Sequence, residues 1–450
     1  MRASLAANLL YFPAARLAGE RVREYLIEYR AHDRVSAAGL LTIQELALAR
    51  IVERARQTVA HYRQAFDARS EAFPSQWGEL QGLEPVAKHW LRAEPERFHS
   101  DRAVGRCERK TTSGSTGHPL TVLKNRDALA RERAATWRAY AWAGIPVAAP
   151  QGLLWGIPHS SSGRLRARAL DVLANRKRLS MFGVSEGELA GFHRRLGRFR
   201  PWYLYGYVSA LVEFVRFLSD TRRRLPTSVR CLITTSELLD ETSRAFLEEN
   251  TGLRVFNEYG CGEVGSIAHE CEHGHLHVMS DNLVLECLPA EGLPDGLGEL
   301  VVTDLHNTAM PLIRYRLGDL GRLANAACPC GRPYPVLEKV VGRAYDTLVG
   351  RSGRKYHPES VLYVFEDLRK EGLSLPPFQA VQGAAGQLDI RFQTDIVALH
   401  EIARLLEPRI TKAFHGDLEA GFSAVAKLER EPSGKLRVVK RAAEAATGSR

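Results

Sequence analysis

The segment from Lys110 to Leu120, KTTSGSTGHPL, combines small residues with hydroxyl side chains. Small residues let backbone N–H groups turn toward a phosphate, and hydroxyl groups can donate hydrogen bonds to its oxygens. The GxxxxGK[ST] spacing of the kinase and GTPase P-loop is absent. Because runs of Ser, Thr and Gly are more often ordinary loops, the segment predicts a phosphate site only together with other nucleotide-handling segments. Its candidate phosphate-binding residues are Thr112, Ser113, Gly114, Ser115, Thr116 and Gly117.

A second segment, Asn257–Glu263, directly follows the apolar run Leu253–Phe256. At a strand end, a tyrosine ring can stack on a base, and a carboxylate oxygen is a ligand that Mg²⁺ prefers. The alternative is a plain strand-to-loop turn. The candidates here are Glu258, Tyr259 and Gly260 for the nucleotide, and Glu263 for magnesium.

Three further segments follow in order. Leu312–Asp319 predicts a buried strand that delivers Asp319, whose carboxylate could accept hydrogen bonds from both ribose hydroxyls; the alternative is a turn with a structural aspartate. Val341–Asp346 contains Arg343, and Glu431–Arg437 contains Lys435.

Cysteine and histidine gather in two short stretches, ECEHGHLH from Glu270 to His277 and CPC from Cys328 to Cys330. Two such ligand pairs joined by a β-rich insert can close a tetrahedral Zn²⁺ site, and four protein ligands would make it structural rather than catalytic. His277 is preferred because it enters the next strand, although Cys261 or His269 could replace one ligand. The alternative is reduced core cysteines with surface histidines. The expected zinc ligands are Cys271, His277, Cys328 and Cys330.

The elements that must position these residues alternate along the chain. Residues 15–72 have helical spacing of apolar residues, and after about residue 105 short apolar runs alternate with helical stretches. Such alternation predicts a mixed α/β sheet with sites at strand ends. The chain then becomes β-rich at 276–324 and ends in a small α+β unit. The helices expected are 126–143, 186–199, 210–221, 240–250, 358–371 and 397–414. The C-terminal strands expected are 379–381, 387–392 and 424–428.

Composition bounds the class of protein. With 450 residues, 45% hydrophobic and 25% charged, the chain is expected to be a soluble protein of two or three domains. No apolar run reaches the length of a membrane span and no secretory signal stands out, so a cytoplasmic location is expected. The net charge of +10 comes largely from arginine clusters that lack interleaved aromatic residues, so nucleic acid is not expected as a partner.

The order and spacing of the five segments resemble the adenylate-forming superfamily of acyl-CoA synthetases, luciferases and peptide-synthetase adenylation domains. The nearest branch looks like the phenylacetate–CoA ligase family, including homologues associated with capsular polysaccharide genes. The resemblance implies a large N-terminal domain, residues 1–345, and a small mobile α+β domain, residues 346–450. The large domain would include a helical part at about 1–105 and a zinc-bearing β-rich part at about 265–340.

The resemblance also implies roles. Residues 113–117, with Thr116 acting in catalysis, would hold the β- and γ-phosphates of ATP. Tyr259 would stack near the adenine, and Glu263 would bind Mg²⁺. Asp319 would hold the ribose with help from Arg343. Asp346 would be the hinge of the small domain, and Lys435 would meet the substrate carboxylate and the α-phosphate.

The implied activity is ATP-dependent conversion of an organic acid to an acyl-adenylate, followed by transfer to coenzyme A. One alternative passes the acyl group to an amine or a hydroxyl, and another is a non-catalytic scaffold that binds nucleotide and zinc. The stretch Trp155–Gly163 does not match the phenylacetate ligases well, so the acid is left open. A homodimer is also left open.

Overall fold

The computed structural model describes residues 7–441 apart from several segments. Nothing is described for residues 68–79, 103–104, 113–119, 156–170, 173, 181–183, 240, 290–295, 342–347, 357–359, 362–363, 366–367, 369–370, 372, 374, 395 and 430–437.

An eleven-stranded sheet forms the centre of the molecule, with the strand order β10-β11-β12-β13-β9-β8-β7-β6-β5-β3-β4. Strands β4, β3, β5, β6 and β7 are parallel to one another. From β7 onward, the neighbours β8, β9, β13, β12, β11 and β10 pair antiparallel, in that order. The strands are β3 (Gln151–Trp155), β4 (Arg176–Ser180), β5 (Tyr203–Tyr207), β6 (Cys231–Thr235), β7 (Arg254–Cys261), β8 (Gly265–Glu270), β9 (Leu276–Val278), β10 (Leu283–Pro289), β11 (Gly298–Asp304), β12 (Tyr315–Leu323) and β13 (Val336–Val341).

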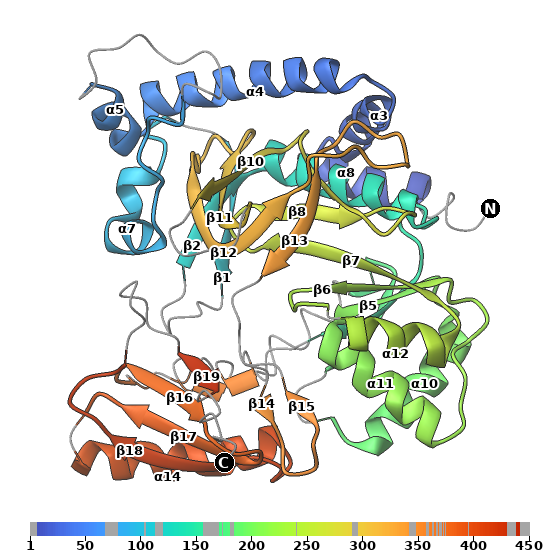
Figure 1. Ribbon diagram of the computed structural model, residues 1–450, viewed down its shortest axis with the longest axis vertical. Helices are drawn as coiled ribbons and strands as arrows, with labels where there is room; N and C mark the ends of the chain where they lie inside the picture. Colours follow the sequence, from blue (N-terminus) through green and yellow to red (C-terminus); the bar gives the residue numbers. More distant parts are fainter. Residues whose placement is uncertain are drawn as a thin grey trace, which may run out of the picture.

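Helices cover the parallel part of the sheet, as the alternating sequence pattern predicts. These helices are α10 (Glu186–Phe199), α11 (Val208–Asp220) and α12 (Glu241–Thr251). Helix α10 has the bounds expected from the sequence. Ser185 forms a capping box with Glu188 at its start, and one face of the helix is buried through Leu189, Phe192 and Leu196. Figure 1 shows the three helices together beside β5 and β6.

The N-terminal helices pack against the antiparallel part. Apolar residues of α4 (Ala37–Thr58) share a core with β10, β11 and β12, and α3 (Val22–His32) packs along α8 (Arg126–Trp142). Figure 1 shows α4 and α5 (Ala60–Asp67) along one edge of the molecule, with α7 (Lys88–Ala93) beside β12. The remaining N-terminal elements are η1 (Ala7–Tyr11), α2 (Phe12–Leu17), η2 (Pro95–Phe98), and the hairpin of β1 (Cys107–Thr112) and β2 (Leu120–Asn125).

The C-terminal residues form a separate core and sheet. The hairpin of β14 (Leu348–Val349) and β15 (Lys355–Tyr356) precedes a four-stranded sheet of order β18-β17-β16-β19. Its elements are β16 (Phe378–Gln382), β17 (Gln387–Phe392), α14 (Ile396–Ala413), β18 (Glu419–Ala424) and β19 (Val439–Arg441). The expected domain boundary at 345–346 lies outside the described residues, so it stays a prediction.

One strand expectation is wrong. The sequence predicts a strand at 424–428, but β18 ends at Ala424. The apolar residues Val425 and Leu428 suggested the strand, yet β18 pairs with β17 from Glu419 onward. Leu428 is buried without belonging to a strand, so its apolar character reflects packing alone.

Among the described residues, none of the helices combines the length and the apolar character that a membrane span needs.

Candidate nucleotide site and cysteine–histidine cluster

The predicted phosphate segment connects the two strands of a hairpin in the chain. Strands β1 and β2 pair antiparallel up to Thr112 and Leu120. Thr112 is the last residue of β1, while Ser113, Gly114, Ser115, Thr116 and Gly117 lie outside the described residues. The structure therefore fixes the two ends of the segment, and phosphate binding by its residues stays a prediction.

A partly buried carboxylate anchors this hairpin to α8. Glu132 Oε1 lies 2.8 Å from Lys110 Nζ of β1, and its Oε2 lies 3.0 Å from Lys124 Nζ of β2. Burial by itself raises the pKa of Glu132, but the charges of Lys124 and Lys110 outweigh it and lower the pKa to about 2. Glu132 thus stays ionised and ties both strands of the hairpin to one helix. No sequence signal marked it, because its partners lie in other elements.

The second segment occupies the end of β7 and the turn into β8. Tyr259 Oη donates a hydrogen bond to Asp319 Oδ2 at 2.8 Å. Asp319 lies in a β-bulge of β12, directly after Gly318 at φ +80°, and bulges re-aim side chains in this way. Strand β12 is four places from β7 in the sheet order, so this contact means that the sheet curls back on itself. The fold therefore brings together two residues that the sequence assigned to one nucleotide.

Gly260 has a packing reason of its own. A Cβ at this position would lie 2.5 Å from the carbonyl oxygen of Gly265 on β8. Any larger residue would push the two strands apart. A glycine here is therefore required by the fold, whether or not it also approaches a nucleotide.

Glu263, the predicted magnesium ligand, is buried in the turn after β7. Lys88 Nζ lies 2.6 Å from its Oε1, and Tyr315 Oη donates to the same oxygen at 3.1 Å. Lys88 is the first residue of α7 and was not among the residues identified from the sequence. A lysine in an irregular, proline-punctuated segment carries no recognisable signal, so only the fold reveals this contact. The carboxylate therefore already faces one positive charge, the ammonium of Lys88.

Glu258 sits in a different environment from Glu263. Tyr140 Oη donates to its Oε2 at 3.1 Å, Ser266 Oγ donates to its Oε1 at 3.2 Å, and Tyr205 also hydrogen-bonds to it. Burial raises the pKa of Glu258 to about 7. Among the described residues its partners are hydroxyl groups, so it differs chemically from the ion-paired carboxylates of the site. Contact with a nucleotide stays a prediction.

Two further predicted residues lie outside the described residues. These are Arg343 and Lys435, and the expected hinge residue Asp346 lies outside them as well. Their roles stay predictions.

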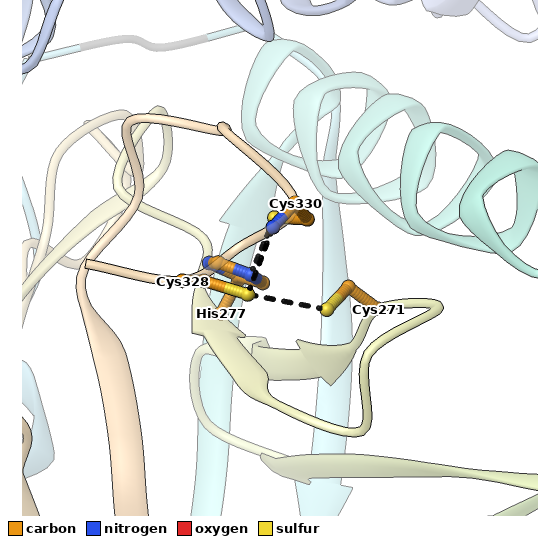
Figure 2. A group of neighbouring side chains, drawn as sticks. All are labelled: Cys271, His277, Cys328 and Cys330. Atoms are coloured by element: carbon orange, nitrogen blue, oxygen red, sulfur yellow. Dashed lines mark hydrogen bonds between the residues drawn. The ribbon is translucent and has the colours of Figure 1, made fainter. Parts of the chain in front are cut away.

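The predicted zinc ligands lie together. Among the described residues, Cys271, His277, Cys328 and Cys330 form one group whose candidate ligand atoms all lie within 4.8 Å of one another. Figure 2 shows the four side chains converging from the β8–β9 segment and from the loop between β12 and β13. Metal binding itself stays a prediction. The two substitutes considered from the sequence lie elsewhere: Cys261 faces the charge of Glu263, and the His269 ring packs against Tyr140.

Comparison with known proteins points to one group of enzymes. None of the protein-family models matches the chain. It is 31% identical over 193 residues to a phenylacetate–coenzyme A ligase of Thermus thermophilus, 41% of this chain and 42% of that protein. It is 29% identical over 326 residues to the ligase of that name from Aromatoleum evansii, 67% of this chain and 69% of that protein. It is also 25% identical over 178 residues to protein CapK of Staphylococcus aureus, covering 39% of each chain.

The match thus spans less than half of the Thermus protein.

Among solved structures, 2-hydroxyisobutyryl-CoA ligase in its thioesterification state matches with a TM-score of 0.63 and 19% identity over 91% of each chain. Its open form matches with a TM-score of 0.56. The mixed α/β fold expected from the sequence is confirmed: the chain is similar in sequence to phenylacetate–coenzyme A ligases and has the fold of 2-hydroxyisobutyryl-CoA ligase.

Proposed function

We propose that the protein is an AMP-forming ligase that activates an organic carboxylate with ATP and then transfers the acyl group to coenzyme A. One observation carries the proposal: Tyr259 and Asp319, from motifs sixty residues apart, meet in a direct hydrogen bond. That contact requires the curled sheet, and both residues belong to the segments that resemble nucleotide-handling motifs. The similarity to phenylacetate–coenzyme A ligases supports the same reading.

The proposed chemistry needs no protein nucleophile. The substrate carboxylate would attack the α-phosphorus of ATP, forming a C–O–P bond as the bond to pyrophosphate breaks. Lys435 would offset the negative charge that gathers on the transferring phosphorus. Residues 113–117 would hold the departing pyrophosphate, and Asp319 would fix the ribose. The thiolate of coenzyme A would then attack the acyl carbon and release AMP.

The residues around Glu263 fit a divalent cation. Glu263 is a buried carboxylate whose Oε1 already faces the ammonium of Lys88. An oxygen donor in a place that favours positive charge suits Mg²⁺. When bound, magnesium would supply positive charge to the triphosphate. Glu263 would hold the ion. The ammonium of Lys88 would then leave Glu263 and either pair with a phosphate oxygen of ATP or move away from the site.

Coenzyme A is the proposed acceptor. The relatives are named as coenzyme A ligases, and the TM-score to the 2-hydroxyisobutyryl-CoA ligase is higher for its thioesterification state, 0.63, than for its open or postadenylation states, 0.55–0.56. The alternative acceptor is an amine or a hydroxyl.

The test is ATP–pyrophosphate exchange across a panel of aryl and aliphatic acids, followed by AMP release with and without coenzyme A. We expect exchange with at least one acid and AMP release that depends on coenzyme A. Exchange without coenzyme A-dependent AMP release would favour an amine or hydroxyl acceptor. Absence of exchange with every acid would favour the nucleotide-binding scaffold and contradict the proposal.

Two lysine variants, one at Lys435 and a control at Lys427, test the proposed mechanism directly. Lys435→Ala should leave ATP binding intact and slow adenylate formation on the order of 100-fold, because one charge that stabilises the transition state is lost. Lys427→Ala is the matched control, since Lys427 is an exposed lysine shortly after β18. Adenylate formation at the normal rate by Lys435→Ala would rule out the proposed mechanism.

A further inference from the structure

The cysteine–histidine cluster is built from two similar turns that face each other. Cys271-Glu-His-Gly274 and Cys328-Pro-Cys-Gly331 each close with a hydrogen bond from the glycine N–H to the carbonyl of the first cysteine, at 3.0 Å and 3.1 Å. Both glycines have positive φ, +80° and +74°. In each turn the backbone N–H two residues after the first cysteine points at its sulfur, at 3.3 Å in one and 3.5 Å in the other.

These N–H groups favour thiolate sulfurs, because hydrogen bonds to a charged form stabilise that form. The thiolate is the form of cysteine that binds metal. Each turn thus stabilises one sulfur as a thiolate, and the two sulfurs face each other. This arrangement indicates a metal site more specifically than clustered cysteines alone.

The distances match a tetrahedral centre. Zinc–sulfur bonds of about 2.3 Å in tetrahedral geometry place two sulfurs roughly 3.8 Å apart, and Cys271 Sγ and Cys328 Sγ are 3.7 Å apart. A disulfide would need about 2.05 Å. Cys330 Sγ lies 3.2 Å from His277 Nε2, so the second pair of donors completes the set. Figure 2 shows both contacts as dashed lines that meet in the same small space.

Neighbouring groups orient and balance the donors. His277 Nδ1 lies 3.0 Å from the carbonyl oxygen of Tyr334, which leaves Nε2 as the ligand atom, as is usual for metal-bound histidine. His275 Nδ1 lies 3.0 Å from Cys328 Sγ and can donate to that sulfur. Three thiolates and one neutral histidine would leave a Zn²⁺ centre with one net negative charge, and the Arg332 side chain hydrogen-bonds to Cys330.

The cluster stands at a thin junction of the large sheet. Strand β9 has only three residues, and it pairs with β13 through two residue pairs, Val336–His277 and Leu337–Leu276. This pairing connects two parts of the sheet. One part contains β10, β11, β12 and β13 and carries Asp319, and the other contains β9, β8, β7, β6, β5, β3 and β4 and carries Tyr259. His277 belongs both to this short pairing and to the cluster. Cys271 and His277 lie on the β8–β9 side of the β9–β13 pairing, and Cys328 and Cys330 lie on the β12–β13 side.

From the geometry we infer that Cys271, His277, Cys328 and Cys330 bind one structural Zn²⁺, which clamps β9 to β13 and so holds the two halves of the sheet in register. Four protein ligands leave no position for a substrate. The ion therefore acts on the arrangement of strands and takes no part in the reaction.

Metal analysis of the full-length protein is the first test. Elemental analysis after extensive dialysis should find about one zinc per chain. The Cys330→Ser variant should hold at least about fivefold less zinc, because it loses a partly exposed ligand. The Cys287→Ser variant is the matched control, a partly exposed cysteine on β10 of the same sheet, and it should keep its zinc. Folded wild-type protein without stoichiometric metal, or with a Cys271–Cys328 disulfide, would overturn the assignment.

Hydrogen exchange tests the clamp without relying on enzyme activity. Removing zinc from wild-type protein with a chelator should speed amide exchange in β9 and β13 at least about tenfold relative to the metal-bound protein, while β5 and β6 exchange as before. Equal exchange at the junction with and without zinc would refute the clamp. Neither readout requires the proposed ligase activity, so the two proposals can fail separately.

Discussion

At the scale of single residues, Glu258 and Glu263 show how different neighbours give two carboxylates of one short segment opposite chemistry. Glu263 faces the ammonium of Lys88, whereas Glu258 faces hydroxyl groups. The pKa of Glu258 is raised to about 7, mainly by burial and also by the charge of Glu132. A carboxyl whose folded pKa exceeds its unfolded value stabilises the fold fully at pH below the unfolded value. That stability is lost as the pH rises through about 7.

Glu258→Gln removes this titration. The wild type should lose roughly 1–3 kcal/mol of unfolding free energy between pH 5 and pH 8.5 through this group, and the variant should not. Urea unfolding at the two pH values measures the difference. Glu249→Gln, an exposed position on α12, is the control and should follow the wild type. A parallel loss of stability in wild type and Glu258→Gln would show that Glu258 does not titrate in this range.

Lys88 gives the second prediction at this scale. The Lys88→Met variant leaves the Glu263 carboxylate buried without its ammonium, which should cost about 3–5 kcal/mol when no metal is added. The same change removes a competitor for Mg²⁺, so the magnesium concentration for half-maximal pyrophosphate exchange should fall roughly tenfold. Thermal unfolding with and without Mg²⁺-ATP, and a magnesium titration of exchange, measure the two effects. Lys339→Met is the control, because Lys339 is an exposed residue on β13. An unchanged magnesium dependence in Lys88→Met would separate Lys88 from the metal site.

At the scale of elements, the hairpin β1–β2 depends on α8 for its position. Glu132 holds Lys110 and Lys124 at once, and its pKa is lowered to about 2 by these two charges. The two strands of the hairpin flank the predicted phosphate segment in the chain, so a looser hairpin should weaken ATP binding more than acid binding.

Glu132→Gln should therefore raise the KM for ATP about tenfold, with a smaller change in the KM for the acid, and should speed amide exchange in β1 and β2. Steady-state kinetics and hydrogen exchange measure these effects. Glu28→Gln is the matched control, because Glu28 pairs with Arg131 of the same helix at the exposed surface. Equal KM values for ATP in Glu132→Gln and wild type would mean that the anchor does not position the phosphate segment.

Local elements of this fold could be predicted from the sequence, but most of the contacts between them could not. Helix α10 carries its own capping residues and apolar spacing, so its bounds follow from neighbours along the chain. The strand expected at 424–428 failed because burial of Leu428 without a strand partner looks the same in sequence as burial within a strand. Lys88 and Glu132 escaped notice because their partners are fixed only by the tertiary fold. The cysteine–histidine group was identified because its residue types are rare and closely spaced.

At the scale of the whole molecule, one contact ties the C-terminal unit to the large sheet's helices. Arg354, just before β15, forms an ion pair with Glu213 of α11 and donates a hydrogen bond to the carbonyl of Val184 at 3.2 Å. Figure 1 shows β14 and β15 next to this helical layer. Under the proposed function, the C-terminal unit would take different arrangements for adenylation and for thioester formation. A contact present in one arrangement must favour that arrangement by its own free energy.

The structure matches the thioesterification state of 2-hydroxyisobutyryl-CoA ligase with a TM-score of 0.63 and its open form with 0.56. Under the proposed function, we assign the Arg354 contact to the arrangement for thioester formation. We therefore expect Arg354→Ala to slow coenzyme A-dependent AMP release about three- to tenfold, since a partly buried charged hydrogen bond contributes on the order of 1 kcal/mol. ATP–pyrophosphate exchange should stay constant or rise, because the adenylation arrangement gains population. Arg351→Ala is the control: Arg351 is exposed and pairs with Glu419 inside the C-terminal unit. If both half-reactions slowed equally in Arg354→Ala, the contact would serve stability alone and would not choose between arrangements.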